Sequence, residues 1–250
     1  MFYDFHTQNF DFRYMENTIC HDMLIENHCH SKFEMLAVSK GDINVIIEGK
    51  SLRLTSGDAV ILPPLLYHTV SSNKKGSYNR FTVFFEPSSI PAPLKEFIFE
   101  KSATPAAFSW HRFDELIKIS KNADEGYHAP LFESLMTEIF YSYHEEKAVI
   151  QRIASEDTLE NVINYIDEHL FEKILLEDIA KHVACSKSLI SHLFQEKMKI
   201  SVKQYIIKKK LAMFDMLVRS GVAPTDASAK LGYEHYSDFY RIRKKHVAQI

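Results

Sequence analysis

Apolar positions recur at helical spacing in the last third of the chain and predict two short helices joined by a tight turn. In the first helix these positions are Leu176, Ile179, Ala180 and Val183. Small residues follow at the turn, and Ser186 is placed to cap the next helix by accepting a backbone N–H. The second helix turns a polar face outward, consisting of Ser188, Ser191, His192 and Gln195. This pattern favours a helix-turn-helix unit, and a fragment of any helical bundle is the alternative.

The same pattern returns between residues 224 and 245, where Gly232 takes the position of Ala184. Beyond the turn, Phe239 and Arg241 correspond to Ile190 and His192, so the second copy has one extra residue at its turn. Residues 201–221 separate the two copies, a length that suits one connecting helix ended by a glycine. Two such units on a rigid linker would reach successive major-groove faces about one DNA turn apart.

The front of the chain, from residue 1 to about residue 90, has a different period and predicts β structure. Its short β-prone runs are Leu24–Ile25, Phe33–Val38, Ile43–Ile47, Leu52–Leu54, Ala59–Leu62, Tyr67–Ser71 and Arg80–Phe85. Turn-forming residues rich in glycine, proline and aspartate separate them. Short strands at this regular spacing predict a small barrel or jelly roll.

Two clusters of chemically active residues lie within this β region. The first is His28-x-His30 followed by Glu34 and Gly41, and the second is Gly57, Pro63 and His68. Their spacing resembles the cupin pattern, except that Leu65 stands where that pattern has glycine. Alternation along a strand places His28 and His30 on one face, so that Glu34 and His68 could join them inside a barrel. The four side chains suit hydrogen bonds to an organic effector, a divalent metal, or a purely structural role.

Residues 91–147 return to helical spacing and predict three helices. Their apolar positions are Leu94, Phe97, Ile98, Phe113, Leu116, Ile117, Ile119, Leu131, Leu135, Ile139, Phe140 and Tyr143. Breaks are expected at Ser102–Pro105 and at Gly126–Pro130. These helices could close the barrel, form a dimer interface, or do both. The charged stretch 148–157 is the expected linker.

Residues 159–249 resemble the AraC/XylS family of bacterial transcription regulators. The residues that carry this resemblance are Ile163, Tyr165, Ile166, His169, Leu176, Ile179, Ala180, Ser186, Ile190, Leu193, Phe194, Tyr205, Ile206, Lys210, Leu211, Leu231, Gly232, Tyr233, Phe239 and Arg241. The chain departs from the family at Met198, Lys210, Phe214, Ala227–Ser228 and Arg243, and it stops before the family's closing segment. In the resembled family the segment before the linker mediates dimerisation, and the β domain senses a small molecule.

Composition is that of a soluble globular protein, with 46% hydrophobic and 25% charged residues. The net charge of −3 is uneven, because residues 155–250 hold 15 Lys and Arg against 13 Asp and Glu. Basic residues gather at 203–210 and 241–246, where phosphate contacts are expected. The scattered Cys20, Cys29 and Cys185 suit a reducing compartment, and neither a signal peptide nor a membrane span is expected.

We therefore expect an α+β protein with four parts. These are a cupin-like effector-binding barrel (1–90), a helical buttress or dimerisation segment (91–147), a linker (148–157) and an all-α tandem helix-turn-helix domain (158–250). The expected DNA-binding residues are Ser186, Lys187, Ser188, Ser191, His192, Tyr236, Ser237, Tyr240, Arg241 and Lys244. The expected effector site is His28, His30, Glu34 and His68, and the same four residues form the alternative metal site.

The function expected from these features is that of a ligand-responsive, sequence-specific DNA-binding regulator and not of an enzyme. Its expected partners are double-stranded DNA, a sugar-like small molecule and a second copy of the chain, with RNA polymerase as a further candidate. We expect a cytoplasmic protein without a cofactor, with a divalent metal as the alternative. A metal-dependent cupin enzyme with a helical appendage, or a decayed regulator acting through protein contacts, are the alternative functions.

Overall fold

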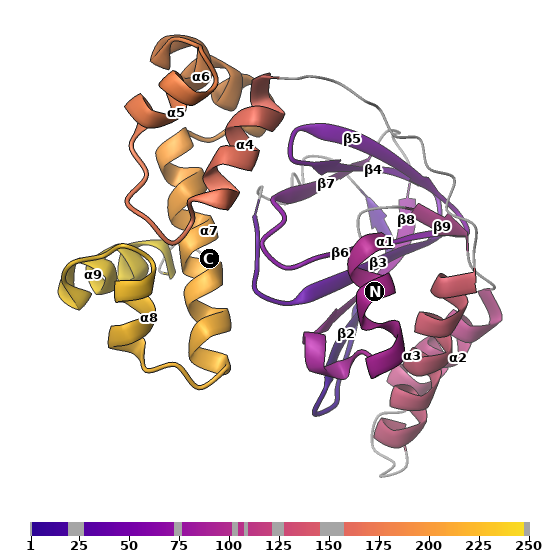
Figure 1. Cartoon of the computed structure of the whole chain (residues 1–250). Helices are drawn as coiled ribbons and strands as arrows, with labels where there is room; N and C mark the ends of the chain where they lie inside the picture. The colour runs from indigo at the N-terminus through magenta and orange to yellow at the C-terminus, as the bar shows by residue number, and fades with distance from the viewer. Residues whose placement is uncertain are drawn as a thin grey trace. The chain divides into compact units, whose positions relative to one another are not determined.

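The chain divides into two compact units (Figure 1), which we call the sheet unit and the helical unit. The computed structural model describes residues 2–19, 28–72, 77–101, 105–107, 110–121, 128–145 and 158–247. The sheet unit comprises Met1–Glu26 and Lys32–Arg152, and the helical unit comprises Ile153–Ile250 together with the short segment Asn27–Ser31. The predicted strand at Leu24–Ile25 and the predicted linker 148–157 lie outside the described residues.

Two antiparallel sheets form the sheet unit. The strands are β1 (Phe2–His6), β2 (Phe10–Ile19), β3 (Phe33–Lys40), β4 (Asp42–Ile47), β5 (Lys50–Thr55), β6 (Asp58–Leu62), β7 (His68–Ser72), β8 (Ser77–Phe85) and β9 (Pro105–Ala107). One sheet has the order β1-β2-β8-β3-β6-β9 and the other has the order β5-β4-β7. The predicted runs from Phe33 onward all form strands, whereas β1, β2 and β9 were not predicted individually.

Strand β3 is buried on both faces, and its alternation decides which side chains meet the second sheet. Phe33, Met35 and Ala37 join a core shared with the helices of this unit. Leu36 and Val38 join a second core with residues of β4, β5 and β7. Because side chains alternate along a strand, Glu34 lies on the same face as Leu36 and points toward the three-stranded sheet.

Three helices cover the other face of the six-stranded sheet: α1 (Lys95–Lys101), α2 (Trp110–Lys121) and α3 (His128–Glu145). Two short 3₁₀ turns, Pro87–Ser89 and Ala92–Leu94, precede them. The buried hydrophobic residues of α2 and α3 all pack in the first core, against this sheet. The break expected at Gly126–Pro130 ends earlier than predicted, because α3 begins at His128. Pro130 lies in the first turn of this helix, where a missing backbone N–H is tolerated. In the described part of the chain, no helix is both long and apolar enough to cross a membrane.

The helical unit consists of six α-helices among the described residues. They are α4 (Thr158–Glu168), α5 (Leu176–His182), α6 (Lys187–Leu193), α7 (Val202–Arg219), α8 (Pro224–Lys230) and α9 (Tyr236–Val247), with a π-helical turn at Phe194–Met198. We call α5–α6 the first helix pair and α8–α9 the second helix pair. The long α7 connects the two pairs, as Figure 1 shows.

Local sequence signals fix the ends of these helices. The Ser186 hydroxyl accepts the backbone N–H of Leu189 at 3.2 Å, which confirms the predicted cap of α6. Ser201 and Gln204 form a capping box at the start of α7. Gly221 follows the end of α7 with a φ of 94°, and the predicted connecting helix is therefore confirmed.

The two turns adopt the same backbone conformation at equivalent positions. Ala184 has a φ of 51° and Gly232 a φ of 78°, so both lie in the left-handed region. Glycine tolerates this conformation, whereas an alanine there costs roughly 1–2 kcal/mol. The repeat found in the sequence is therefore also a repeat of backbone geometry.

Candidate functional site

A buried ion pair joins the two sheets at the centre of the candidate effector site. The Nε2 atom of His68 on β7 lies 2.9 Å from Oε2 of Glu34 on β3. Their side chains are 1% and 6% exposed, respectively. A charged pair this deeply buried needs both of its partners, because either group alone would be an uncompensated charge.

The turn before β7 places His68 in this position. Leu65 has a φ of 67°, the left-handed conformation for which the cupin pattern uses glycine. The turn is held by Glu48, whose carboxylate accepts the backbone N–H of Tyr67 at 3.0 Å. The departure from the cupin pattern at Leu65 therefore does not prevent the turn from forming.

Hydrogen bonds fix the protonation of His68. Its Nδ1 atom lies 2.9 Å from the carbonyl oxygen of Leu66, which can only accept, so Nδ1 carries a proton. Burial alone would lower the pKa of His68, but the hydrogen bond and the charge of Glu34 outweigh it and raise this pKa. The carboxylate of Glu34 therefore favours the protonated form of His68.

His28 and His30 complete the cluster. One ligand atom from each of His28, His30, Glu34 and His68 lies within 4.8 Å of the others. The rings of the two histidines before β3 have centroids 5.7 Å apart, although His28 forms only an isolated bridge and His30 lies outside any strand. The spacing in the sequence thus identified four residues that the structure brings together.

This donor set fits a divalent cation. Three imidazoles and a carboxylate are ligands for Zn²⁺ and similar ions, which bind them at about 2.0–2.2 Å. The hydrogen bond from Nδ1 of His68 to a carbonyl is the kind that orients a metal-binding histidine. To bind here, an ion would have to displace the proton on Nε2 of His68 and so replace the hydrogen bond between His68 and Glu34.

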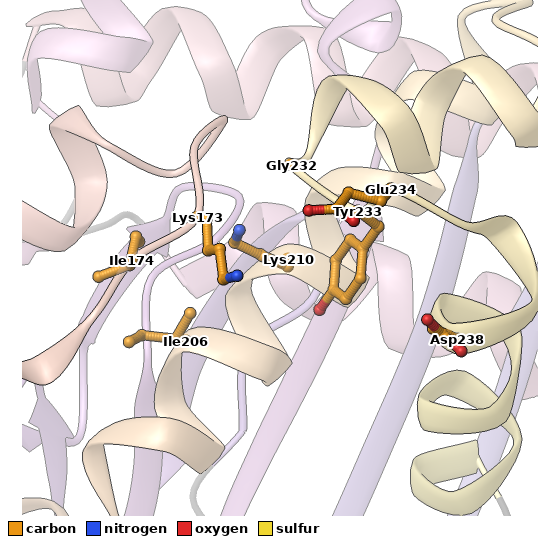
Figure 2. A pocket seen from close by; sticks show the side chains of 8 residues that line it. All are labelled: Lys173, Ile174, Ile206, Lys210, Gly232, Tyr233, Glu234 and Asp238. Carbon is orange, nitrogen blue, oxygen red and sulfur yellow. The ribbon is translucent and has the colours of Figure 1, made fainter.

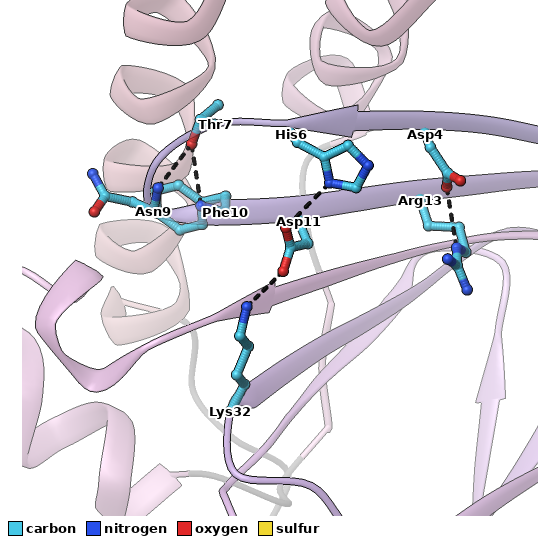
Figure 3. Close-up of polar contacts among 8 residues, drawn as sticks. All are labelled: Asp4, His6, Thr7, Asn9, Phe10, Asp11, Arg13 and Lys32. Atoms are coloured by element: carbon cyan, nitrogen blue, oxygen red, sulfur yellow. Dashed lines mark hydrogen bonds and ion pairs between the residues drawn. The ribbon is translucent and has the colours of Figure 1, made fainter. Parts of the chain in front are cut away.

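A second polar network, which the sequence did not identify, anchors the segment that carries the two histidines (Figure 3). Lys32, just before β3, donates to Oδ2 of Asp11 on β2 at 2.6 Å, and His6 lies 3.1 Å from the other oxygen. Burial alone would raise the pKa of Asp11, but these two hydrogen bonds lower it, so Asp11 is ionised at neutral pH. The ion pair fixes the entry of the chain into β3.

The first helix pair exposes the polar face expected from its sequence. Ser186, Lys187, Ser188, Ser191 and His192 are all exposed. Lys187 on α6 pairs with Glu177 on α5 at 2.6 Å, and this hydrogen bond lowers the pKa of Glu177. An exposed pair of this kind is weak, so Lys187 could exchange Glu177 for another anion.

The second helix pair exposes Ser237, Tyr240, Arg241 and Lys244 of α9. Tyr236 differs, because it is half-buried and packs against the core that contains Phe239 and Phe214. Arg241 forms an ion pair with Asp238 on the same helix. Arg243, which occupies a normally aromatic position of the resembled family, stacks over the Phe214 ring and pairs with Asp215 at 3.2 Å.

Part of the basic cluster on α7 is not available for phosphate contacts. Lys209 is 2% exposed and binds Asp167 of α4 at 2.5 Å, and Lys210 is 5% exposed. The expectation that residues 203–210 form a basic outer face is therefore wrong for these two lysines. A charge count along the sequence cannot show which face of a helix is buried.

The sequence of this chain is similar to those of a known protein family and of a bacterial regulator. The family described as the AraC-like ligand binding domain matches residues 20–163, which is more than half of the chain. The chain belongs to this family. It is also 21% identical over 238 residues to an uncharacterized HTH-type transcriptional regulator, YdiP of Escherichia coli strain K12, covering 88% of this chain and 78% of that protein.

Solved structures of ToxT from Vibrio cholerae are also similar over most of the chain. A ligand-free, singly substituted form of ToxT aligns with a TM-score of 0.46 and 10% identity, covering 96% of this chain and 94% of that one. ToxT bound to an unsaturated fatty acid aligns with a TM-score of 0.41 and 12% identity, covering 98% and 89%.

Proposed function

We propose that this chain is a ligand-responsive, sequence-specific DNA-binding transcription regulator of the AraC type. Its family membership supports a ligand-binding role for the first part of the chain, and the relative from Escherichia coli is a transcriptional regulator by name. The observation that carries the DNA-binding part is the repeated helix pair, in which both turns share a left-handed residue and both second helices expose polar side chains.

The first helix pair is the stronger candidate for reading bases. The helix α6 presents Ser188, Ser191 and His192 to solvent, and its exposed polar face matches that of a recognition helix in a major groove. The second pair would contribute Tyr240, Arg241 and Lys244. Serine and histidine discriminate bases less sharply than arginine or glutamine, so modest intrinsic specificity follows.

The DNA-binding claim is tested by selecting duplexes from a random pool with the full-length protein. Enrichment of a sequence motif supports the proposal. A pool that stays random after several rounds, with a protein that binds all duplexes equally, would favour the decayed regulator.

The cluster of half-buried His28 and His30 with buried Glu34 and His68 is the proposed effector site. It offers imidazole N–H groups as donors and a carboxylate as an acceptor, and these groups suit the hydroxyls of a sugar-like molecule. A divalent cation at the same cluster is the second candidate, favoured by the 4.8 Å separation of the four ligand atoms. The ion would then supply a positive charge to which an effector oxygen could bind.

Metal analysis and a titration separate the two candidates. Candidate sugars are added to the full-length protein with and without a chelator, and the melting temperature is recorded. Stabilisation by a sugar that survives chelation supports the metal-free sensor. A metal that copurifies in stoichiometric amount, together with a sugar response that chelation abolishes, supports the metal-bound site.

We further propose that the regulator acts as a cytoplasmic homodimer through α2 and α3. The exposed large apolar side chains of α3 are Leu131 and Tyr141, at 45% and 57% exposure. Two half-sites on DNA also favour a two-fold symmetric protein. Sedimentation at tens of micromolar tests this proposal, which a monomer with and without effector would contradict.

A further inference from the structure

One buried ammonium group contacts the second helix pair and the segment that leads into the first helix pair. Lys210 lies on α7, and its Nζ atom donates to the carbonyl oxygen of Leu231 at 2.7 Å. It also donates to the carbonyl oxygen of Glu172, just before the first helix pair. Leu231 is the C-cap of α8 in the second pair, whereas Glu172 lies in the segment between α4 and α5 that leads into the first pair. A single side chain therefore bridges them.

The backbone of the second pair also touches the segment before the first pair beside this bridge. A Cβ atom added to Gly232 would lie 2.8 Å from the carbonyl carbon of Glu172 and 2.9 Å from the nitrogen of Lys173. Only glycine fits there, because these neighbours are backbone atoms that cannot move aside. Gly232 follows Leu231 directly, so close backbone packing and the Lys210 hydrogen bonds occur at one place.

A small pocket of about 340 Å³ borders the contact, with Lys210 in its wall (Figure 2). Its other lining residues are Lys173, Ile174, Ile206, Gly232, Tyr233, Glu234 and Asp238. The pocket lies between residues of the second pair and the segment Lys173–Ile174, which leads into α5. Lys210 and Gly232 thus add contacts at this point to the packing of the second pair on Phe214 of α7.

An ammonium group is suited to this bridging role. It has three donors, and the carbonyl of a helix C-cap is an acceptor without an intrahelical partner. The positive charge is also favoured at the C-terminal end of α8. The ammonium group also lies over the Tyr233 ring, with Nζ 5.4 Å from the ring centroid, which is a cation–π contact. Burial lowers the pKa of Lys210 to about 8, so the group is still mostly protonated at neutral pH.

We propose that Lys210, together with Gly232, fixes the separation of the recognition helices α6 and α9 and so sets the spacing between the two DNA segments that the protein reads. This inference rests on the proposed DNA-binding function of both pairs. Lys210 is a positioning residue, since its ammonium group is turned to backbone carbonyls inside the protein and is shielded from solvent.

The test compares DNA selection by the full-length wild type with selection by Lys210→Met. The matched control is Lys230→Met, which makes the same change at an exposed position of α8. We expect the wild type and the control to select two sequence blocks at one separation. We expect Lys210→Met to select the same blocks at several separations, because each pair still reads its own block.

Affinity for a site with one inserted base pair makes the test quantitative. The insertion moves the second block by roughly 3.4 Å along the axis. The wild type should lose at least about tenfold in affinity, the order of one mismatched base pair, and Lys210→Met less than about threefold. Circular dichroism confirms folding, and Lys210→Gln replaces the methionine variant if that variant is unfolded.

The possible failures are distinguishable. A Lys210→Met protein that keeps one sharp separation and the full tenfold penalty overturns the positioning role and leaves the proposed function intact. A wild type that enriches no sequence blocks overturns the proposed function, and the spacing inference with it.

Discussion

Replacing Glu34 with glutamine removes the charge of the buried pair while keeping its shape. The two side chains are 6% and 1% exposed, so water does not replace the lost carboxylate. If His68 kept its proton beside an amide, the loss would be about 3–5 kcal/mol, as for a buried pair that loses one partner. The imidazole can release that proton instead, and its bond to Leu66 is unaffected. We therefore expect a loss of about 1.5–3 kcal/mol, the value of a hydrogen bond to a charged group.

The loss should depend on pH in a defined direction. Because Glu34 raises the pKa of His68 in the folded state, the pair stabilises the protein fully below the ordinary histidine pKa of about 6.5. This contribution is lost as the pH rises through the higher folded-state pKa. The difference between wild type and Glu34→Gln should thus be larger at pH 6 than at pH 9.

Urea unfolding followed by tryptophan fluorescence measures this effect. The chain has a single tryptophan, Trp110, at the start of α2 in the sheet unit, so the signal reports on that unit. Glu96→Gln, at an exposed position of α1, serves as the matched control and should change the free energy of unfolding little. Equal stability of wild type and Glu34→Gln at pH 6, or the same pH dependence in both, would refute the assignment of a charged buried pair.

Other predictions concern the helical unit. Ser186→Ala should lower the unfolding free energy by about 1 kcal/mol through loss of the α6 cap, as measured by urea unfolding followed by circular dichroism; an unchanged value would show that another group caps the helix. His192→Ala should cost roughly 1–3 kcal/mol of binding to the selected site and little on random DNA, and equal losses on both would remove its base-reading role. Gly232→Ala should destabilise the helical unit because its new Cβ meets backbone at 2.8 Å, and a melting temperature equal to that of wild type would contradict the close contact.

Periodicity made much of the architecture predictable. The alternation from Phe33 onward identified strands β3 to β8, and the helical spacing around Ser186 identified the first helix pair and its cap. The His28-x-His30, Glu34 and His68 spacing identified four side chains whose ligand atoms meet within 4.8 Å. The strands and the first helix pair follow from local rules, because each depends on spacing within one element. The four-residue cluster joins β3 and β7 and was predicted from the resemblance to the cupin pattern.

What the sequence did not predict depends on contacts between distant segments. The alternation of Phe10, Phe12 and Tyr14 was available as a signal for β2, yet its place beside β8 follows only from the assembled sheet. The basic run on α7 suggested a phosphate-binding face, but Asp167 and two carbonyls turn Lys209 and Lys210 inward. Leu65 departs from the cupin pattern, although its backbone adopts the conformation that glycine would supply.

The central claim is that the chain binds a specific DNA sequence, and competition binding at physiological salt tests it most directly. Full-length protein is bound to a labelled duplex carrying the selected motif and is displaced by unlabelled duplexes of the same composition with the motif intact or shuffled. We predict that the intact motif competes at least about a thousandfold better, the lower end for specific DNA-binding proteins. Equal competition by the intact and the shuffled duplex would contradict it.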